Sequence, residues 1–186
     1  MSQQEDILLR TKILEGNQKA FRQFYVKYNK WFYLTCLRYV SSKEDAQDLL
    51  QDALVLMHRD LPKYDASKGQ LKYWCRKVVV NVCLQYLRKK SVLRDFDELG
   101  ETMDVLVADE QAIDSLSLKE LLGYINMLPK GYRTIFNLYV IDGYNHREIG
   151  TMMNISPSTS KTQLMKARRM LQLQINKINN QVRVRV

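Results

Sequence analysis

A stretch that begins at Asn145 constrains the fold more than any other part of the chain, because its capping and turn residues fit one arrangement of two helices. Asn145 is followed three residues later by Glu148, which resembles a capping box at the start of a short helix. Asn154 can adopt the left-handed backbone conformation that ends such a helix. Ser156-Pro157 is a favourable start for a second helix. Gly150 lies where two crossing helices need a small residue, so the pattern predicts a helix-turn-helix.

When residues are placed about 100° apart, the second of these two helices has one face expected to be buried and an opposite face expected to be exposed. The residues expected to be buried are Ser160, Leu164, Ala167 and Leu171. The opposite, outer face holds candidates for contact with DNA: Ser158, Thr159, Lys161, Thr162, Met165, Lys166 and Arg169. No Asp or Glu follows Glu148, which suits a phosphate backbone. Two crossing helices also occur in proteins that never meet DNA, so plain packing is the alternative interpretation.

If the helix-turn-helix binds DNA, the first turn of its second helix enters the major groove. Lys161, Thr162 and Lys166 could then reach base edges or phosphates. Met165 could offer an apolar contact to a thymine methyl group.

Most of the remaining chain also has the three- and four-residue spacing of apolar side chains that predicts helices. The predicted helices cover residues 4–15, 17–40, 43–61, 70–90, 116–128 and 132–141. Ser42 is expected to cap the third of them and Pro62 to end it. Asp65–Gly69 has the composition of a polar loop, and Pro129–Gly131 that of a turn. With only 7 Gly and 3 Pro to interrupt helices, the prediction is an all-α fold.

Charge divides the chain into three parts. Residues 1–90 hold 17 Lys and Arg against 9 Asp and Glu, residues 91–120 hold 2 against 9, and residues 121–186 hold 10 against 2. Two basic parts separated by an acidic one indicate two modules that touch a polyanion and a connection that should not. We therefore predict small helical domains at residues 1–90 and 116–186, the second carrying the helix-turn-helix, joined by a flexible acidic linker at residues 91–115.

Several classes of protein are disfavoured. No apolar run approaches the roughly 20 residues of a membrane span, and the polar start is unlike a signal peptide, so we expect no membrane insertion and a cytoplasmic protein. Cys36, Cys75 and Cys83 form no C-x-x-C pair and are expected to be buried thiols. With His58 and His146 as the only histidines, no metal site is expected. No phosphate-binding loop or nucleophile motif occurs, so we expect neither an enzyme nor a cofactor.

The predicted 43–61 helix carries carboxylates on one stripe, at Asp45, Asp48 and Asp52. Such a stripe is often no more than a solvated face. In a chain with a basic balance, it is also a candidate docking surface for a basic partner.

The predicted 70–90 helix interleaves cations with aromatic residues. Its cations are Lys72, Arg76, Lys77, Arg88, Lys89 and Lys90. Bases drawn out of a duplex can stack on aromatic rings while cations hold the backbone. Trp74 lies on the apolar stripe and is expected in the core, which leaves Tyr73 as the freer aromatic candidate.

Several segments in order resemble the extracytoplasmic-function (ECF) sigma factors, over about residues 17–90 and 120–173. The first is Glu44-Asp45-Ala46-Gln47-Asp48-Leu49-Leu50-Gln51-Asp52, similar to the family's E-D-A-x-D-L-x-Q. The second is Gly69 to Trp74 with Asn81 and Leu87-Arg88, similar to its F-x-x-W-L helix. The third comprises Leu128 to Arg133, Glu148-Ile149-Gly150 and Ser156 to Ala167, similar to its C-terminal run.

The resemblance implies a role for each candidate surface in binding RNA polymerase core enzyme and promoter DNA. It implies that the acidic helix docks on the polymerase core through Asp45, Asp48, Gln51 and Asp52. It implies that the 65–70 loop and the next helix capture the melted −10 element, through Ser67, Lys68, Lys72, Tyr73, Arg76, Lys77, Asn81 and Arg88. The second helix of the helix-turn-helix would read the −35 element, and the acidic linker would thread through polymerase channels. An anti-sigma factor is a further expected partner.

The sequence departs from the family pattern at a few positions. Leu71 and Cys75 replace Phe and Leu and keep the stripe apolar, while Gln85 stands where many members have Asp. In the second helix of the helix-turn-helix, Ser160 replaces a Val and is expected to weaken the small core. Gln163 replaces an Arg and changes a possible DNA contact.

Two other functions stay open from the residues alone. A stand-alone helix-turn-helix regulator would bind operator DNA without polymerase, but it leaves residues 17–90 without a role. A helical module that binds only proteins would bind DNA no better than its charge allows.

Overall fold

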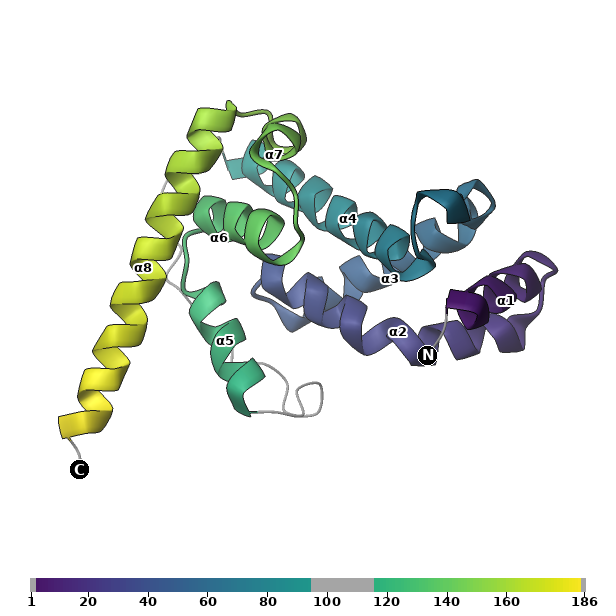
Figure 1. Cartoon of the computed structure of the whole chain (residues 1–186), viewed down its shortest axis with the longest axis horizontal. Coiled ribbons are helices and arrows are strands. Elements are labelled where there is room, and N and C mark those ends of the chain that lie inside the picture. The colour runs from purple at the N-terminus through teal and green to yellow at the C-terminus, as the bar shows by residue number, and fades with distance from the viewer. Residues whose placement is uncertain (1–2, 95–115, 185–186) are drawn as a thin grey trace. The chain divides into compact units, whose positions relative to one another are not determined.

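The computed structural model describes the backbone of residues 3–94 and 116–184 (Figure 1). Every regular element in these residues is helical, and none of the helices there is long and apolar enough to cross a membrane. The chain divides into two compact units, Met1–Gly100 and Glu101–Val186. The predicted all-α fold in two helical parts is confirmed.

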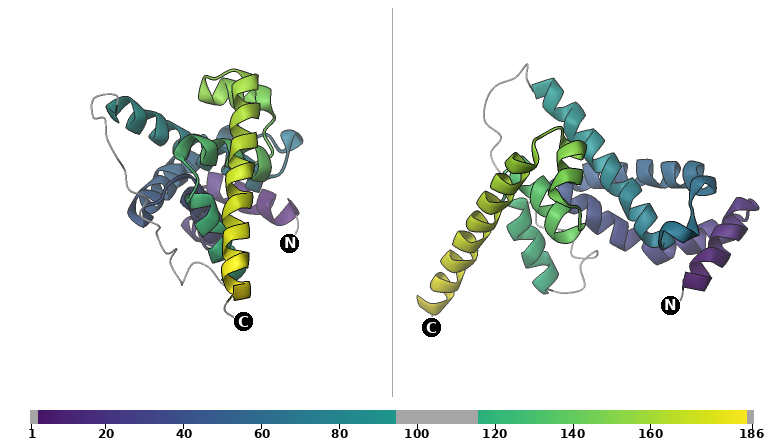
Figure 2. Two further views of the ribbon diagram at one scale, coloured as in Figure 1. Left: turned by 90° about the vertical axis from the view of Figure 1, so that its left-hand side faces the viewer. Right: turned by 45° about the horizontal axis from the view of Figure 1, so that its top comes forward.

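The first unit is built from four helices and two short 3₁₀ turns. The helices are α1 (Gln3–Leu14), α2 (Gln18–Tyr39), α3 (Lys43–Asp60) and α4 (Leu71–Arg94), with the turns η1 (Leu61–Lys63) and η2 (Ala66–Lys68) between the last two. Helices α2, α3 and α4 pack against one another, and α1 lies against α2 and one end of α4 (Figures 1 and 2).

The core of the first unit is formed by apolar side chains from α2, α3 and α4. Its buried side chains include Phe24, Phe32, Ala46, Ala53, Met57, Leu71, Val79 and the three cysteines Cys36, Cys75 and Cys83. Burial raises the pKa of the Cys75 thiol, which keeps it protonated. Phe24 and Tyr28 lie one turn apart on the core side of α2 with 5.2 Å between ring centroids, whereas Tyr25 is 38% exposed.

Local capping explains where these helices begin and end. Asn17 accepts a hydrogen bond from the Ala20 amide at 3.1 Å and caps α2. Ser42 accepts one from the Asp45 amide at 3.0 Å and caps α3, as predicted. Helix α3 ends at Asp60, and Pro62 lies in the 3₁₀ turn that follows.

Helix α4 extends beyond the predicted boundary at residue 90. It continues to Arg94, since Ser91-Val92-Leu93-Arg94 contains neither Gly nor Pro to stop a helix. The first four residues of the predicted 91–115 linker are therefore helical, and residues 95–115 lie outside the described residues.

The second unit contains α5 (Leu116–Asn126), α6 (Lys130–Phe136), the π-helical turn η4 (Asn137–Ile141), α7 (His146–Met153) and α8 (Pro157–Val184). Its core includes Leu128, Ala167 and Leu171, with Tyr124, Tyr132, Phe136 and Met170 packed against them. The predicted turn at Pro129–Gly131 is wrong, because Pro129 caps α6 and the helix begins at Lys130. Pro is favourable at a helix start since it has no N–H to leave unpaired.

Candidate nucleic-acid and protein interfaces

The helix-turn-helix forms through the capping residues expected from the sequence. The Asn145 side chain accepts from the amides of Arg147 at 2.9 Å and Glu148 at 3.0 Å, and Glu148 Oε2 accepts from the Asn145 amide at 2.8 Å. Asn154 ends α7 in the left-handed conformation, with φ 53° and ψ 47°. Ser156 Oγ accepts from the Thr159 amide at 3.0 Å and caps α8. The predicted motif is confirmed in each of these details.

Gly150 is required where the turn passes close to α7. A Cβ atom added there would lie 2.8 Å from the Ile155 carbonyl oxygen and 3.6 Å from Pro157. Because the closest atom belongs to the backbone, the turn would have to move to make room.

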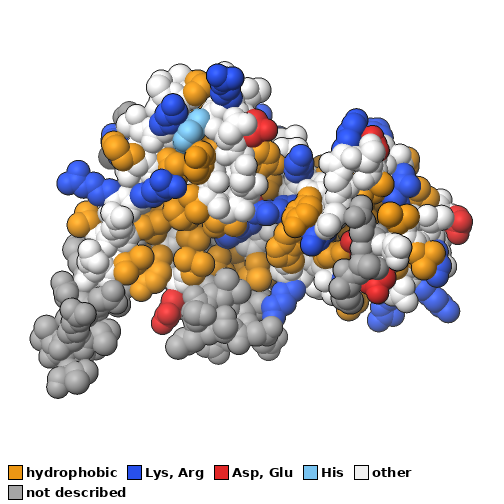
Figure 3. Space-filling view, in the orientation of Figure 1, with side chains coloured by type: hydrophobic (Ala, Val, Ile, Leu, Met, Phe, Trp, Pro, Cys, Tyr) orange, Lys and Arg blue, Asp and Glu red, His pale blue; other side chains and the backbone are white. Residues whose placement is uncertain are grey.

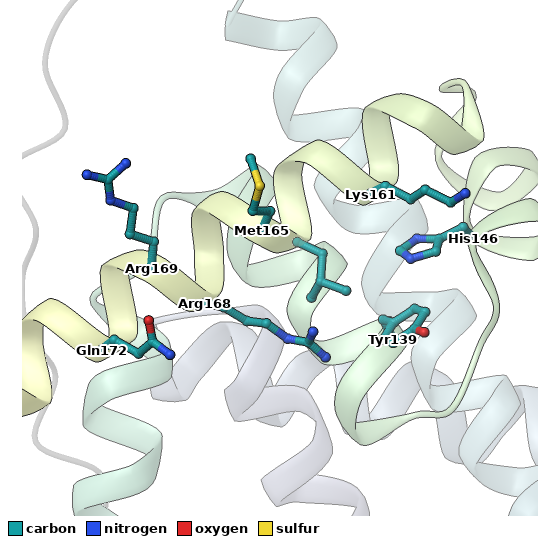
Figure 4. A pocket seen from close by; sticks show the side chains of 8 residues that line it. Tyr139, His146, Lys161, Met165, Arg168, Arg169 and Gln172 are labelled. Carbon is teal, nitrogen blue, oxygen red and sulfur yellow. The ribbon is translucent and has the colours of Figure 1, made fainter.

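The outer face of α8 presents all seven predicted DNA-contact residues, and each of them is exposed. Met165 is 64% exposed. The hydroxyls of Ser158 and Thr159 lie 2.7 Å and 2.8 Å from Ser156 Oγ, so they already belong to the cap of α8. In Figure 4, Met165 and Arg169 project away from the outer side of α8, where they are accessible to a ligand.

An open hollow of about 590 Å³ lies beside this face, within the second unit. It is lined by Tyr139, His146, Lys161, Leu164, Met165, Arg168, Arg169 and Gln172 (Figure 4). On the face shown in Figure 3, Lys and Arg side chains surround the upper part of α8 and α7, with apolar side chains between them. The hollow therefore combines apolar walls with cations suited to an anionic ligand.

His146 lines one end of the hollow beside Tyr139 and Lys161 (Figure 4), and the sequence pattern did not indicate it as a site residue. Its ring stacks on Tyr139 at 4.4 Å between centroids, with 22° between the planes. Burial, followed by the charges of Lys161 and Arg168, lowers the pKa of His146 below its ordinary value. The signal in the sequence was weak, since Lys161 and Arg168 share a stripe of α8 but Tyr139 and His146 come from other elements.

Ser160 is fully buried, yet its hydroxyl has a partner. His146 Nδ1 lies 2.9 Å from Ser160 Oγ, which links the start of α7 to α8. A buried hydroxyl without a partner would cost free energy, and this hydrogen bond removes that penalty. Ser160 therefore contributes a polar link between helices where the family pattern has an apolar contact.

The acidic face of α3 is divided between two environments. Asp48, Gln51 and Asp52 are exposed. Asp45 is partly buried, and its Oδ2 accepts from the Tyr86 hydroxyl at 2.7 Å and lies 3.9 Å from Lys90 Nζ. Burial and the hydrogen bond to Asp45 raise the pKa of Tyr86, so this hydroxyl stays a donor. One of the four predicted docking residues thus ties α3 to α4.

Exposed residues of the predicted −10 set share one side of α4. Tyr73, Lys77, Asn81 and Arg88 are exposed at spacings of four, four and seven residues. Tyr73 is 49% exposed, and Lys72 Nζ lies 4.8 Å from the centre of its ring. Arg76 lies to the side, partly buried, with its guanidinium 5.7 Å from the Trp31 ring. This side of α4 therefore presents the accessible ring of Tyr73 together with the positive charges of Lys77 and Arg88 and the side-chain amide of Asn81.

The loop before α4 also carries two of the predicted residues, Ser67 and Lys68, and both are exposed. Asp65 Oδ1 accepts from the Ser67 amide at 2.9 Å and from its hydroxyl at 2.7 Å. Gly69 has a φ of +136°, which a residue with a Cβ rarely adopts. Beneath the loop, the ring of Trp74 lies 5.9 Å from that of Tyr64 and is only partly exposed. The loop is therefore ordered by its own hydrogen bonds.

Among the described residues, no group of three or more His, Cys, Asp or Glu side chains is arranged to hold a metal ion.

Two family models match separate parts of the chain. Residues 24–92 match the model described as Sigma-70 region 2, and residues 118–171 match Sigma-70, region 4. The first match covers α3, the loop and most of α4, and the second covers α6, α7 and the first half of α8.

Curated relatives and solved structures agree with these matches. The ECF RNA polymerase sigma factor SigM of Bacillus subtilis is 31% identical over 158 residues, which is 83% of this chain and 94% of that protein. The ECF RNA polymerase sigma-E factor of Escherichia coli K12 is 27% identical over 182 residues, 90% of this chain and 93% of that protein. The sigma factor RpoE of Bartonella quintana, solved in complex with the anti-sigma factor NepR, shares the fold with a TM-score of 0.58, at 21% identity over 85% of this chain and 98% of that one.

Proposed function

Because this chain belongs to the ECF RNA polymerase sigma factors and directs polymerase to promoters, we propose that its two units bind different parts of the promoter. In this proposal, residues 1–90 dock on the polymerase core and capture the −10 element. Residues 116–186 bind the −35 element, and the acidic residues 91–115 connect them. This assignment of one promoter element to each unit is supported by the exposed basic residues on both α4 and α8.

The −35 element is read by the outer face of α8. Lys161, Lys166 and Arg169 neutralise phosphates or reach base edges, and Met165 contacts a thymine methyl group. The capped turn between α7 and α8 supports this role, because it holds the first turn of α8 in a fixed direction.

The −10 element is captured as single strand by the first unit. Unstacking a base costs a few kcal/mol, which stacking and polar contacts must offset. Tyr73 supplies an exposed ring, Lys77 and Arg88 supply cations, and Asn81 supplies a polar group for a base edge. Ser67, Lys68, Lys72 and Arg76 complete the surface in this proposal.

The polymerase core is bound by the acidic face of α3. Asp48, Gln51 and Asp52 form the contact, and Asp45 supports it from within the unit through Tyr86. A carboxylate stripe on a chain with a net charge of +9 suits a basic protein surface and would be repelled by DNA.

The stand-alone regulator is not favoured, since the match of residues 24–92 to Sigma-70 region 2 gives the first half a role in transcription initiation. We infer that the protein acts in the cytoplasm beside the polymerase and leaves the chemistry to that enzyme. We also propose an anti-sigma partner. The structural neighbour RpoE, which was crystallised with the anti-sigma factor NepR, supports that partner.

Run-off transcription with purified core enzyme tests the proposal. Genomic fragments recovered with the chain from cells serve as templates. We expect a transcript of defined length only when core enzyme and chain are both present. If no fragment gives a promoter-directed transcript, the chain does not act as proposed.

A further inference from the structure

The 65–69 loop (Asp65–Gly69) is held at its last residue, Gly69, by the side chain of Tyr64, the residue that directly precedes the loop. The Tyr64 hydroxyl donates to the Gly69 carbonyl oxygen at 2.7 Å, so the hydrogen bond spans the loop. Tyr64 is 6% exposed, whereas every residue from Asp65 to Gly69 is exposed. The loop is therefore held from beneath while its upper side is left accessible.

The Tyr64 hydroxyl keeps its proton and can always donate this hydrogen bond. Burial is the largest influence on Tyr64 and raises its pKa, so the group stays protonated at neutral pH. Its ring packs against Trp74 with 5.9 Å between centroids, which fixes the direction of the hydroxyl.

Helix α1 also contacts Tyr64, through Arg10. Arg10 Nη2 donates to the carbonyl oxygens of Tyr64 at 3.3 Å and Pro62 at 3.5 Å. The same guanidinium lies 5.5 Å from the centre of the Tyr64 ring. Arg10 thus holds both the backbone and the ring of the residue that fastens the loop.

Helix α1 is in turn fixed to α2 by a buried carboxylate. Asp6 accepts from Lys27 Nζ at 2.6 Å and from the Tyr28 hydroxyl at 2.7 Å. Burial and the bond to Asp6 raise the pKa of Tyr28 to about 12. Because Asp6 and Arg10 are one helical turn apart, the anchor at Asp6 also restrains the position of Arg10.

We propose that Tyr64 and Arg10 are positioning residues for base recognition, which hold the 65–69 loop in its base-accepting shape without touching DNA. The proposal rests on the role assigned above to the loop in capturing the −10 strand. A loop that is ordered before binding loses less conformational entropy when a base enters, and it rejects a wrong base more strongly than a loop that can adapt. Helix α1 thereby contributes to promoter choice through Arg10.

The test uses holoenzyme made with the full chain and a Tyr64→Phe variant, which keeps the ring and removes the hydroxyl. The probe is forked DNA from a promoter active in the run-off assay, with each of the four bases in turn at each single-stranded −10 position. We expect the preference for the best base to fall about fivefold at one or two positions, the effect of one lost hydrogen bond. Affinities for core enzyme and for the −35 duplex should not change.

Matched variants separate positioning from general damage. Tyr25→Phe removes a tyrosine hydroxyl from an exposed site on α2 and should leave base preference unchanged. Arg10→Lys keeps the charge but loses the planar guanidinium, and should lower base preference in the same positions. The double variant should lose less than the sum of the single losses, because both act through one loop.

Unchanged base preference in both Tyr64→Phe and Arg10→Lys would overturn the proposal. An equal loss of affinity for all bases and for core enzyme would also overturn it, since that outcome means a merely structural role. If the unmodified chain shows no base preference at the single-stranded positions, then the assigned role of the loop fails instead.

Discussion

At the scale of single residues, two carboxylates on the same stripe of α3 have different environments. Asp45 and Asp48 are one turn apart on α3, yet Asp45 accepts from Tyr86 while Asp48 is exposed. A substitution at Asp45 breaks a contact within the unit, whereas one at Asp48 changes an exposed surface charge. Residue-scale experiments on this face should therefore begin at Asp48.

Asp48→Arg should weaken binding to polymerase core at least tenfold, because it places a cation on a surface proposed to meet a basic partner. Binding to the −35 duplex should be unchanged, and so should the thermal unfolding midpoint. Titration of labelled core enzyme measures the first effect. Lys19→Glu, a charge change at an exposed residue of α2, serves as the control. Unaltered core affinity in Asp48→Arg would rule out this docking face.

Lys166→Ala should weaken −35 duplex binding for all sequences to a similar degree, as expected for a phosphate contact. The slope of log affinity against log salt concentration should fall by about one. Fluorescence anisotropy of holoenzyme with duplex probes at several salt concentrations measures both. Lys19→Ala removes the same charge from an exposed site on α2 and should leave the slope unchanged. An unchanged slope in Lys166→Ala would remove this residue from the interface.

At the scale of elements, α7 and α8 are coupled at two points of different chemistry. Gly150 lets the turn pass within a distance that no side chain would tolerate, and His146 bonds the buried Ser160. The first contact depends on shape and the second on protonation. The geometry of the helix-turn-helix should therefore respond separately to packing and to pH.

Gly150→Ala should destabilise the second unit by about 1–3 kcal/mol, since its Cβ would lie 2.8 Å from a backbone oxygen. Hydrogen exchange of the α7 and α8 amides should become faster. Gly123→Ala is the matched control on α5, where nothing lies within 4 Å of the added atom. That change should be neutral or stabilising by up to about 1 kcal/mol. Equal exchange rates in both variants would show that the close approach is not needed.

The stability of the second unit should fall as the pH drops through the ordinary pKa of histidine. His146 has a lowered pKa in the folded chain, so the unfolded chain binds a proton more readily over the interval between the two values. Stability therefore rises with pH through this interval and levels off above the unfolded pKa, about 6.5. Hydrogen exchange of α7 at pH 5.5, 6.5 and 7.5 measures the trend. His146→Asn should flatten it, and a variant with an unaltered trend would exclude His146 as its source.

At the scale of the whole chain, charge is arranged so that two basic parts flank an acidic one. Residues 91–120 hold 9 acidic residues against 2 basic ones, while the parts on either side are strongly basic. The acidic part should repel DNA and lower the affinity of the free chain for duplex. The acidic face of α3 adds to this effect. If the polymerase covers this acidic surface as proposed, tight promoter binding should depend on the polymerase.

The free chain should bind promoter duplex at least tenfold more weakly than the holoenzyme does under the same salt conditions. Replacing Asp104 and Asp109 with Asn and Glu110 with Gln should raise the affinity of the free chain for non-specific duplex, because three repelling charges are removed. Gel-shift titrations at fixed ionic strength measure both. Tight, sequence-specific binding by the free chain would instead support the stand-alone regulator.

The features that were predictable from the sequence alone depend on residues only a few positions apart. Ser42, Asn145, Glu148 and Ser156 each accept from an amide two or three positions away, and Asn154 ends α7 through its own left-handed backbone conformation. The apolar stripes are predictable for the same reason, since they depend only on the helical repeat.

Contacts between side chains that lie far apart in the sequence could not be predicted and are seen only in the folded chain. The partner of Asp45 is Tyr86, 41 residues away, and Arg10 reaches the carbonyl of Tyr64, 54 residues away. No local pattern specifies such pairs, because they exist only once several helices have packed in one register.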